Sequence, residues 1–123
     1  MRKPGSTGIM LTVDQCALTL KALADHTRLR ILESLLVEEK CVTDLVRHLH
    51  CPQPHISHHL RILRDAGLVE GIREGQQVCY RIAPRVQHVL TNRQGLALNF
   101  GCCELRFPDP AFSHVKRRTH LLT

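Results

Sequence analysis

The sequence has very few aromatic residues, with no tryptophan, one tyrosine and three phenylalanines among 123 residues. All three phenylalanines, Phe100, Phe107 and Phe112, lie after residue 95. The core before that point must therefore be built from Leu, Ile, Val and Ala, and the change in composition marks the C-terminal residues as a separate segment. A chain of this length is typical of one domain with a modest hydrophobic core.

Long apolar runs are also missing from the sequence. No stretch approaches the roughly 18 to 20 apolar residues that a membrane span needs, and the opening MRKPGSTGIM lacks the apolar stretch of a secretory signal. We therefore expect a soluble cytoplasmic protein with no membrane partner. A disulfide framework among its six cysteines is disfavoured in a reducing compartment, which leaves metal binding, thiol chemistry or burial as their roles.

The motifs of common enzyme classes are absent as well. The sequence has no Gly-rich phosphate loop, no Cys-x-x-Cys and no motif that joins a cysteine to an adjacent base. We therefore expect a protein that is not an enzyme and has no small-molecule substrate. Its charge points to another role, because 17 Lys and Arg against 11 Asp and Glu give a net charge of +6, which favours a polyanionic partner.

The first two thirds of the chain carry helical periodicity. Residues 1–9 show no apolar period and are expected to form a flexible arm. Four helices are predicted after it: one from Met10, one capped by Asp25, a short one capped by Thr43, and one that stops at Gly67.

The residues that follow alternate between apolar and polar side chains. Residues 68–82 predict a β-hairpin with Gly75 at its turn and with Cys79 pointing away from the core. A final helix is predicted to begin at Pro84 and to end at Gly95.

Two short helices joined by a tight turn and followed by a basic hairpin describe a winged helix-turn-helix, a mostly α fold with a small β-hairpin. The fourth predicted helix has a polar and basic face opposite its apolar stripe, and side chains of these types hydrogen-bond to base edges and phosphates. The alternative is an ordinary solvated helix face, but the neighbouring hairpin favours DNA binding. The candidate DNA contacts are Gln53, His55, Ser57, His58, Arg61, Arg64, Arg73 and Gln76.

Four motifs occur in order between about residues 20 and 83: ALADHTRLRILESLL, KCVTDLVRHL, QPHISHHLRILRDAGLV and REGQQVCYRI. Together they resemble the ArsR/SmtB family of bacterial metal-responsive repressors. The resemblance implies a homodimer with its first and last helices at the interface, a fourth helix that enters operator DNA, and release of DNA when an effector binds. We divide the chain into the arm, a winged helix-turn-helix domain at 10–95, and a C-terminal tail at 96–123.

The sequence departs from the family pattern at two positions. Many relatives have Pro where His26 stands and Ser where Pro52 precedes Gln53. The second difference removes a hydroxyl that would cap the fourth helix and contact phosphate, so Gln53 or water would have to replace it.

Two adjacent cysteines, Cys102 and Cys103, lie in a tail region where some arsenic-sensing relatives place vicinal cysteines. Soft thiolates bind thiophilic ions, and three sulfurs in a pyramid suit arsenite or antimonite, whereas Cd, Pb or Zn accept three or four ligands. Adjacent side chains of a strand point in opposite directions, so chelation by both requires a local turn, which Gly101 can supply. We expect a soft-metal site here, with one buried and one exposed structural cysteine as the alternative.

The third ligand is left open among three cysteines. Cys41 is the first choice because it matches a family ligand, although the family's second cysteine is replaced by Thr43. Cys51, beside the fourth helix, and Cys16, able to reach across a dimer, are the alternatives, and each of the three taken alone fits a small core residue better than a ligand.

Other roles for the histidines and cysteines were weighed. His55 with His58 or His59 has spacing that can hold zinc, but the neighbouring residues face DNA, so this site is disfavoured. A rival to metal sensing is a disulfide or persulfide of Cys102 with another thiol; relatives that sense sulfur species use a second-helix cysteine where Glu33 stands. A DNA-binding architectural protein without an effector is a further alternative.

Overall fold

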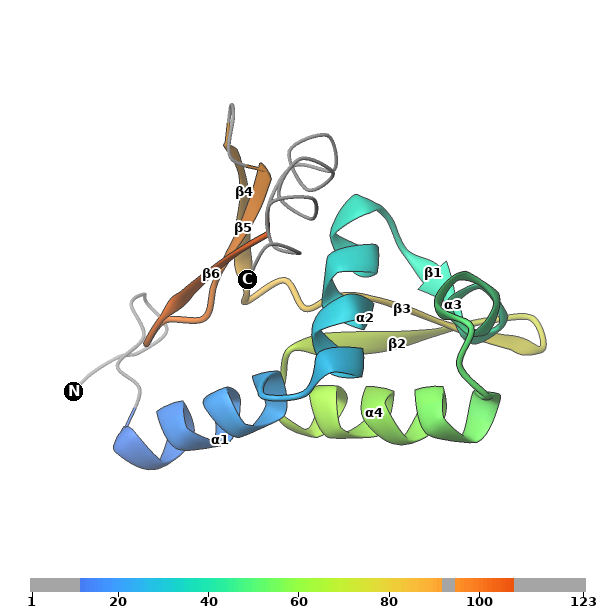
Figure 1. Cartoon of the computed structure of the whole chain (residues 1–123), viewed down its shortest axis with the longest axis horizontal. Helices are drawn as coiled ribbons and strands as arrows, with labels where there is room; N and C mark the ends of the chain where they lie inside the picture. The colour runs from blue at the N-terminus through green and yellow to red at the C-terminus, as the bar shows by residue number, and fades with distance from the viewer. Residues whose placement is uncertain (1–11, 92–94, 108–123) are drawn as a thin grey trace, which may run out of the picture.

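The computed structural model describes residues 12–91 and 95–107. Four helices and three strands form a winged helix-turn-helix, and a second sheet of three strands follows it (Figure 1). In the part of the chain that is described, no helix is both long enough and apolar enough to cross a bilayer. The elements are α1 (Val13–Leu23), α2 (His26–Val37), β1 (Lys40–Cys41), α3 (Val42–Leu49), α4 (Gln53–Asp65), β2 (Val69–Glu74), β3 (Gln77–Ile82), β4 (Gln87–Thr91), β5 (Gly95–Asn99) and β6 (Glu104–Phe107).

The helix starts follow local side-chain hydrogen bonds. Asp25 caps α2, as predicted. The prediction that Thr43 caps α3 is wrong, because the N-cap is Cys41, whose backbone N–H donates to the Asp44 carboxylate at 3.1 Å. Cys41 is extended because β1 pairs with β3, and the helix begins at the next residue, Val42. Thr43 therefore lies inside the first turn of the helix and not at its cap.

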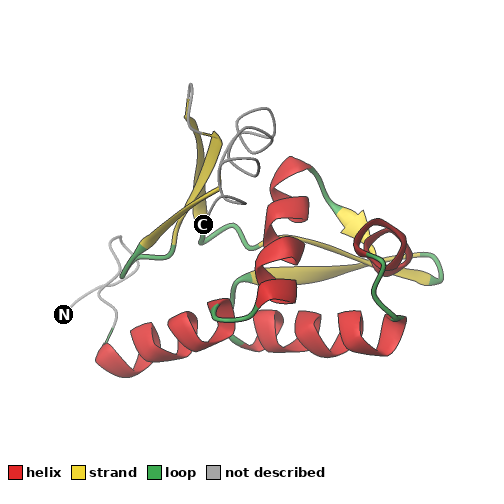
Figure 2. Ribbon diagram, in the orientation of Figure 1, coloured by secondary structure: helices red, strands yellow, loops and turns green. Residues whose placement is uncertain are grey.

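The core is aliphatic, as the composition predicts. α2, α3 and α4 pack together, and the hairpin β2–β3 covers one side of them (Figure 2). Each fully buried Leu or Ile is stabilising by about 1.5 to 3 kcal/mol relative to an exposed side chain. Gly75 has a φ of +66° at the tip of the hairpin, which confirms the predicted turn. The fully buried side chains of these elements, and of the link between α4 and β2, include Ile31, Leu32, Leu45, Ile56, Leu60, Leu63 and Leu68.

The predicted final helix between Pro84 and Gly95 is wrong. The chain instead forms β4 and β5, which pair antiparallel with Val89 opposite Ala97, and β6 adds a third strand in the order β4-β5-β6. β-branched residues such as Val89 favour a strand, and β5 supplies backbone partners that a sequence pattern for residues 84–95 alone does not reveal. The fold class therefore holds for the winged helix-turn-helix, with a second sheet in place of a last helix.

The second sheet packs against the main core. Leu98 and Phe100 belong to the same buried cluster as the helices, and Cys103 and Leu105 pack against it from partly exposed positions. The sequence suggests a boundary at residue 95, which is the first residue of β5. This boundary separates two strands that pair with each other, because β4 precedes it and β5 follows it. The N-terminal arm at 1–9 and the tail beyond residue 107, with Phe112, lie outside the described residues.

Cys79 lies outside the core cluster that contains its strand neighbour Tyr80 and against which Val78 packs, as its alternation predicts, but it is not exposed on the hairpin. Its side chain is only 2% exposed. The two-residue strand β1 pairs with β3 on the side opposite β2 and places Cys41 directly across from Cys79. A strand of two residues leaves no alternation in the sequence, so this cover could not be foreseen.

Candidate functional site

The candidate DNA contacts all lie on the surface. Six of them are exposed on α4 and two on the hairpin, and the helix buries its opposite face through Ile56, Leu60 and Leu63. The exposed set is Gln53, His55, Ser57, His58, Arg61, Arg64, Arg73 and Gln76.

The start of α4, helix α3 and the tip of the hairpin lie at the same end of the molecule (Figure 1). Between them is a cleft of about 270 Å³ with polar side chains from all three elements. Thr43 comes from α3, Gln53 and Ser57 from α4, and Gln76 and Gln77 from the hairpin. The helix and the hairpin therefore present hydrogen-bonding groups to one shared space, as reading of a DNA groove beside its backbone requires.

The start of α4 carries no side-chain cap. Pro52 is the N-cap residue and makes no side-chain hydrogen bond, and Pro54 lies in the first turn. The departure at Pro52 therefore has the expected structural effect: α4 begins without a side-chain hydroxyl to cap its first backbone N–H groups. A helix N-terminus of this kind attracts phosphate oxygens.

Three partly buried side chains form a network that connects α4 to α1 and α2. Arg28 donates from Nε to the Ala22 carbonyl at 2.7 Å, and its Nη1 lies 3.1 Å from His59 Nδ1. The Asp25 carboxylate accepts from the backbone N–H groups of Thr27 and Arg28 and lies 3.8 Å from His59 Nδ1. His59 is thus engaged with Asp25 and Arg28.

The network shifts the pKa values of two of its members. Burial lowers the pKa of His59, and the Arg28 charge lowers it further against the opposing effect of Asp25. Burial acts to raise the pKa of Asp25, but the N–H of Arg28 and the charges of His59 and Arg28 outweigh it and hold that pKa below its ordinary value. The neutral ring of His59 and the ionised Asp25 are therefore the favoured forms in the fold.

We expect His59 to make the protein less stable in mild acid. Its folded pKa lies below the ordinary value of 6.5, so its contribution is complete above that pH and is lost as the pH falls through the folded pKa. His59→Gln is expected to cost about 1 kcal/mol at pH 7.5 through the hydrogen bond to Arg28, and to flatten the pH dependence. Urea unfolding from pH 5 to 7.5 measures both effects. His58→Gln, an exposed neighbour, is the control, and equal slopes in both variants would contradict the assignment.

The two tail cysteines lie in a tight turn before β6. Gly101 has a φ of +97°, its N–H donates to the Asn99 side chain at 2.8 Å, and the Phe100 N–H donates to the Cys103 carbonyl at 2.9 Å. The local turn expected at Gly101 is therefore confirmed. It brings Cys102 Sγ to 3.9 Å from Cys103 Sγ, so the two thiols point to one place.

A third thiol, that of Cys16 on α1, lies beside this pair. A hydrogen bond with Cys102 raises the pKa of the Cys16 thiol, and burial and the charges of Cys102 and Cys103 raise it further. Burial raises the pKa of Cys103, and its hydrogen bond with Cys102 adds to the effect. Cys102 therefore disfavours ionisation of both Cys16 and Cys103, and we name these three residues the tail thiol cluster.

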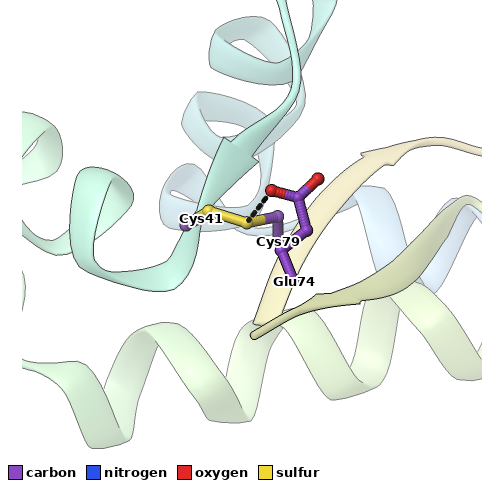
Figure 3. A group of neighbouring side chains, drawn as sticks. All are labelled: Cys41, Glu74 and Cys79. Carbon is purple, nitrogen blue, oxygen red and sulfur yellow. Dashed lines mark hydrogen bonds between the residues drawn. A yellow bond between two sulfur atoms is a disulfide. The ribbon is translucent and has the colours of Figure 1, made fainter. Parts of the chain in front are cut away.

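A second thiol group lies on the other side of the molecule. Cys41 and Cys79 are joined by a disulfide, and Glu74 Oε1 lies 4.0 Å from the Cys79 sulfur (Figure 3). These three residues form the one group of at least three Cys, His, Asp or Glu ligands within mutual reach that the described residues contain. That group includes none of His55, His58 and His59, and the three sulfurs of the tail thiol cluster are not all within 4.8 Å of one another.

The structure thus divides the cysteines that the sequence offered as metal ligands. Cys102 and Cys103 are together and Cys16 joins them, whereas Cys41 is bonded to Cys79. Cys51 is half-buried and packs against the core. The proximity of Cys16 to Cys102 could not be predicted from the sequence, because it depends on how the second sheet folds back toward α1.

Comparison with known proteins identifies relatives of this chain. Residues 25–71 match the family model described as bacterial regulatory protein, arsR family. The SmtB transcriptional repressor of Mycobacterium tuberculosis is 45% identical over 71 residues, or 58% of this chain and 53% of the relative, so the chain spans about half the length of that protein. A probable mercury resistance operon repressor of Streptomyces lividans is 32% identical over 115 residues, covering 84% of this chain and 92% of the relative.

The solved structures give the same result for the fold. The homodimeric winged helix-turn-helix DNA-binding domain Mb0332 of Mycobacterium bovis, described as a possible ArsR-family regulator, matches with a TM-score of 0.57 and 38% identity. The match covers 59% of this chain and 68% of that one. With a family model across the helix-turn-helix and a relative matched over most of both sequences, the chain belongs to the ArsR/SmtB family of bacterial regulators.

Proposed function

We propose that the protein is a homodimeric transcriptional repressor that binds operator DNA and releases it when a thiophilic metal or metalloid binds the tail thiol cluster, with arsenite or antimonite favoured. The observation that carries the proposal is the approach of Cys102 Sγ to 3.9 Å from Cys103 Sγ in a chain of winged helix-turn-helix fold, with the neighbouring Cys16 thiol as the candidate third ligand. We take Cys16 as the third ligand in place of Cys41, whose sulfur is bonded to Cys79.

The protonation state of the thiols favours a trivalent metalloid. Three neutral thiols and arsenous acid, As(OH)3, form three As–S bonds and three water molecules, with no net release of protons. A divalent ion such as Cd, Pb or Zn must first expel protons from thiols whose pKa is raised, which weakens its binding near neutral pH. Three sulfurs around one centre also match the pyramidal coordination of arsenic and antimony.

The surface of α1 supports a dimer. Val13, Leu18 and Leu20 are 84%, 60% and 52% exposed, although each is a large apolar side chain. Exposed apolar residues gathered on one helix mark a surface for another protein. The Mycobacterium bovis domain is described as a homodimer, which favours a second copy of this chain as the occupant.

The same helix connects the tail thiol cluster to the DNA-binding helix. Cys16 lies near the middle of α1, and Arg28 binds the carbonyl of Ala22 near its end and the ring of His59 on α4. A bound effector ties α1 to the turn at Cys102 and Cys103 and stabilises the conformer that allows this geometry. Changing the population from almost fully bound to almost fully free requires a preference of about 5.5 kcal/mol, which several metalloid–thiolate bonds can supply.

DNA mobility shifts with reduced protein test the proposal. An operator selected from random duplexes is expected to bind at least about 10³-fold more tightly than an unselected duplex at the same salt. Arsenite or antimonite should release it at lower concentrations than Cd, Pb or Zn. Equal binding to both duplexes would indicate an architectural DNA-binding protein, and release by peroxide alone would indicate thiol oxidation as the signal.

A further inference from the structure

Cys41 and Cys79 join two parts of the DNA-binding unit that are 38 residues apart in the chain. Cys41 is the N-cap of α3, and Cys79 lies in the middle of the hairpin strand β3. They are directly opposite each other in the antiparallel pairing of β1 with β3, so their side chains meet without any rearrangement of the sheet. Neither residue contributes to the tail thiol cluster.

The two sulfurs differ in access to solvent. Cys41 is half-buried, whereas Cys79 is 2% exposed and has the Glu74 carboxylate 4.0 Å from its sulfur. Figure 3 shows the carboxylate beside the S–S bond, at the end of β2. The pair therefore combines a thiol that a small oxidant can reach with a covered thiol next to a group that can accept its proton.

We propose that Cys41 and Cys79 are a hydroperoxide-sensitive thiol pair whose disulfide fixes the hairpin to the helix-turn-helix, as a second input to DNA binding that is separate from the metal response. The Cys41 thiolate attacks one peroxide oxygen and the O–O bond breaks, which gives a sulfenic acid; the released hydroxide or alkoxide takes up the proton that the Cys41 thiol gave up and becomes water or an alcohol. The Cys79 sulfur then attacks the Cys41 sulfur, the S–S bond forms, and the hydroxyl leaves as water with the proton of the Cys79 thiol. Two thiols are oxidised and one peroxide is reduced.

The bond acts on the cleft that the candidate DNA contacts line. The cleft is lined by Thr43 on α3 and by Gln77 on the hairpin. Cys41 lies two residues before Thr43, and Cys79 lies two residues after Gln77. A covalent link next to both walls holds them in the arrangement seen here. Pre-organisation of a binding surface lowers the cost of ordering it, so oxidation is expected to tighten operator binding by roughly 3- to 10-fold.

The test uses full-length protein with Cys102→Ser and Cys103→Ser, which removes two of the three thiols of the tail cluster. After hydrogen peroxide and proteolysis, mass spectrometry is expected to find the Cys41 peptide linked to the Cys79 peptide, and anisotropy is expected to show tighter operator binding that dithiothreitol reverses. Adding Cys41→Ser should remove both effects. Circular dichroism confirms that each variant is folded.

Three outcomes would overturn the proposal. The first is persistence of two free thiols at positions 41 and 79 after peroxide treatment. The second is formation of the disulfide with no change in operator affinity. The third is retention of one equivalent of zinc or cadmium by the reduced protein through Cys41, Glu74 and Cys79, because these three ligands would then be a metal site.

Discussion

Replacing Cys102 and Cys103 by serine is expected to abolish release of operator DNA by arsenite while leaving the affinity of the effector-free protein for DNA unchanged. The substitution removes the two sulfurs that meet before β6 and leaves only Cys16 on α1, which cannot hold the metalloid alone. Hydroxyl groups bind soft ions poorly, so the preference of about 5.5 kcal/mol that release requires is lost. The measurement is operator anisotropy against arsenite concentration, with the wild-type protein alongside.

Two further variants make the result specific to the tail thiol cluster. Cys16→Ser leaves the vicinal pair intact, and we expect it to weaken the arsenite response by about 10-fold or more, because one of the three sulfur ligands is lost. Cys51→Ser is the control, since Cys51 packs against the core and belongs to neither thiol group. The proposal is wrong if the double variant still releases DNA on arsenite, or if Cys51→Ser loses the response as completely.

The DNA-binding half of the molecule could be predicted because its signals are local. Asp25 at the N-cap predicts α2, and Gly75 predicts the turn of the hairpin. The apolar stripe of Ile56, Leu60 and Leu63 predicts α4. Each of these signals spans one element and requires no knowledge of what packs on it. Burial of the apolar stripe of α4 then places this helix beside the hairpin.

The second sheet and the two thiol groups depend on contacts between distant residues. Pro84 and Gly95 are both compatible with helix ends, so only the pairing of β4 with β5 decides that the segment is extended. Cys16 meets Cys102 because the strands that follow residue 86 return to α1. Cys79 is covered by a strand of two residues. The periodicity of the sequence carries no information about such long-range contacts. The turn at Gly101 could be predicted, because two adjacent thiols on a straight strand point to opposite faces and cannot bind one ion together.

Replacing Arg61 by alanine is expected to cause the largest loss of operator binding of any single change on α4. Arg61 is exposed near the middle of the helix, one residue after buried Leu60, whereas Arg64 lies 3.7 Å from the Asp65 carboxylate and is partly neutralised by it. An arginine that contacts a base edge contributes about 1 to 3 kcal/mol to discrimination against the wrong base. A homodimer presents the residue twice, so the loss amounts to roughly 2 to 6 kcal/mol for the whole complex.

The salt dependence of binding separates base recognition from charge alone. Arg106→Ala removes the same charge from β6, where the guanidinium pairs with Glu104 at 3.0 Å, and is the matched control. A base contact by Arg61 predicts that Arg61→Ala lowers the affinity for the selected operator far more than for an unselected duplex, with a nearly unchanged slope against salt. A phosphate contact predicts an equal loss on both duplexes and a slope smaller by about one per side chain removed. Loss of affinity equal to that of Arg106→Ala would place α4 outside the DNA interface, because the effect would then come only from net charge.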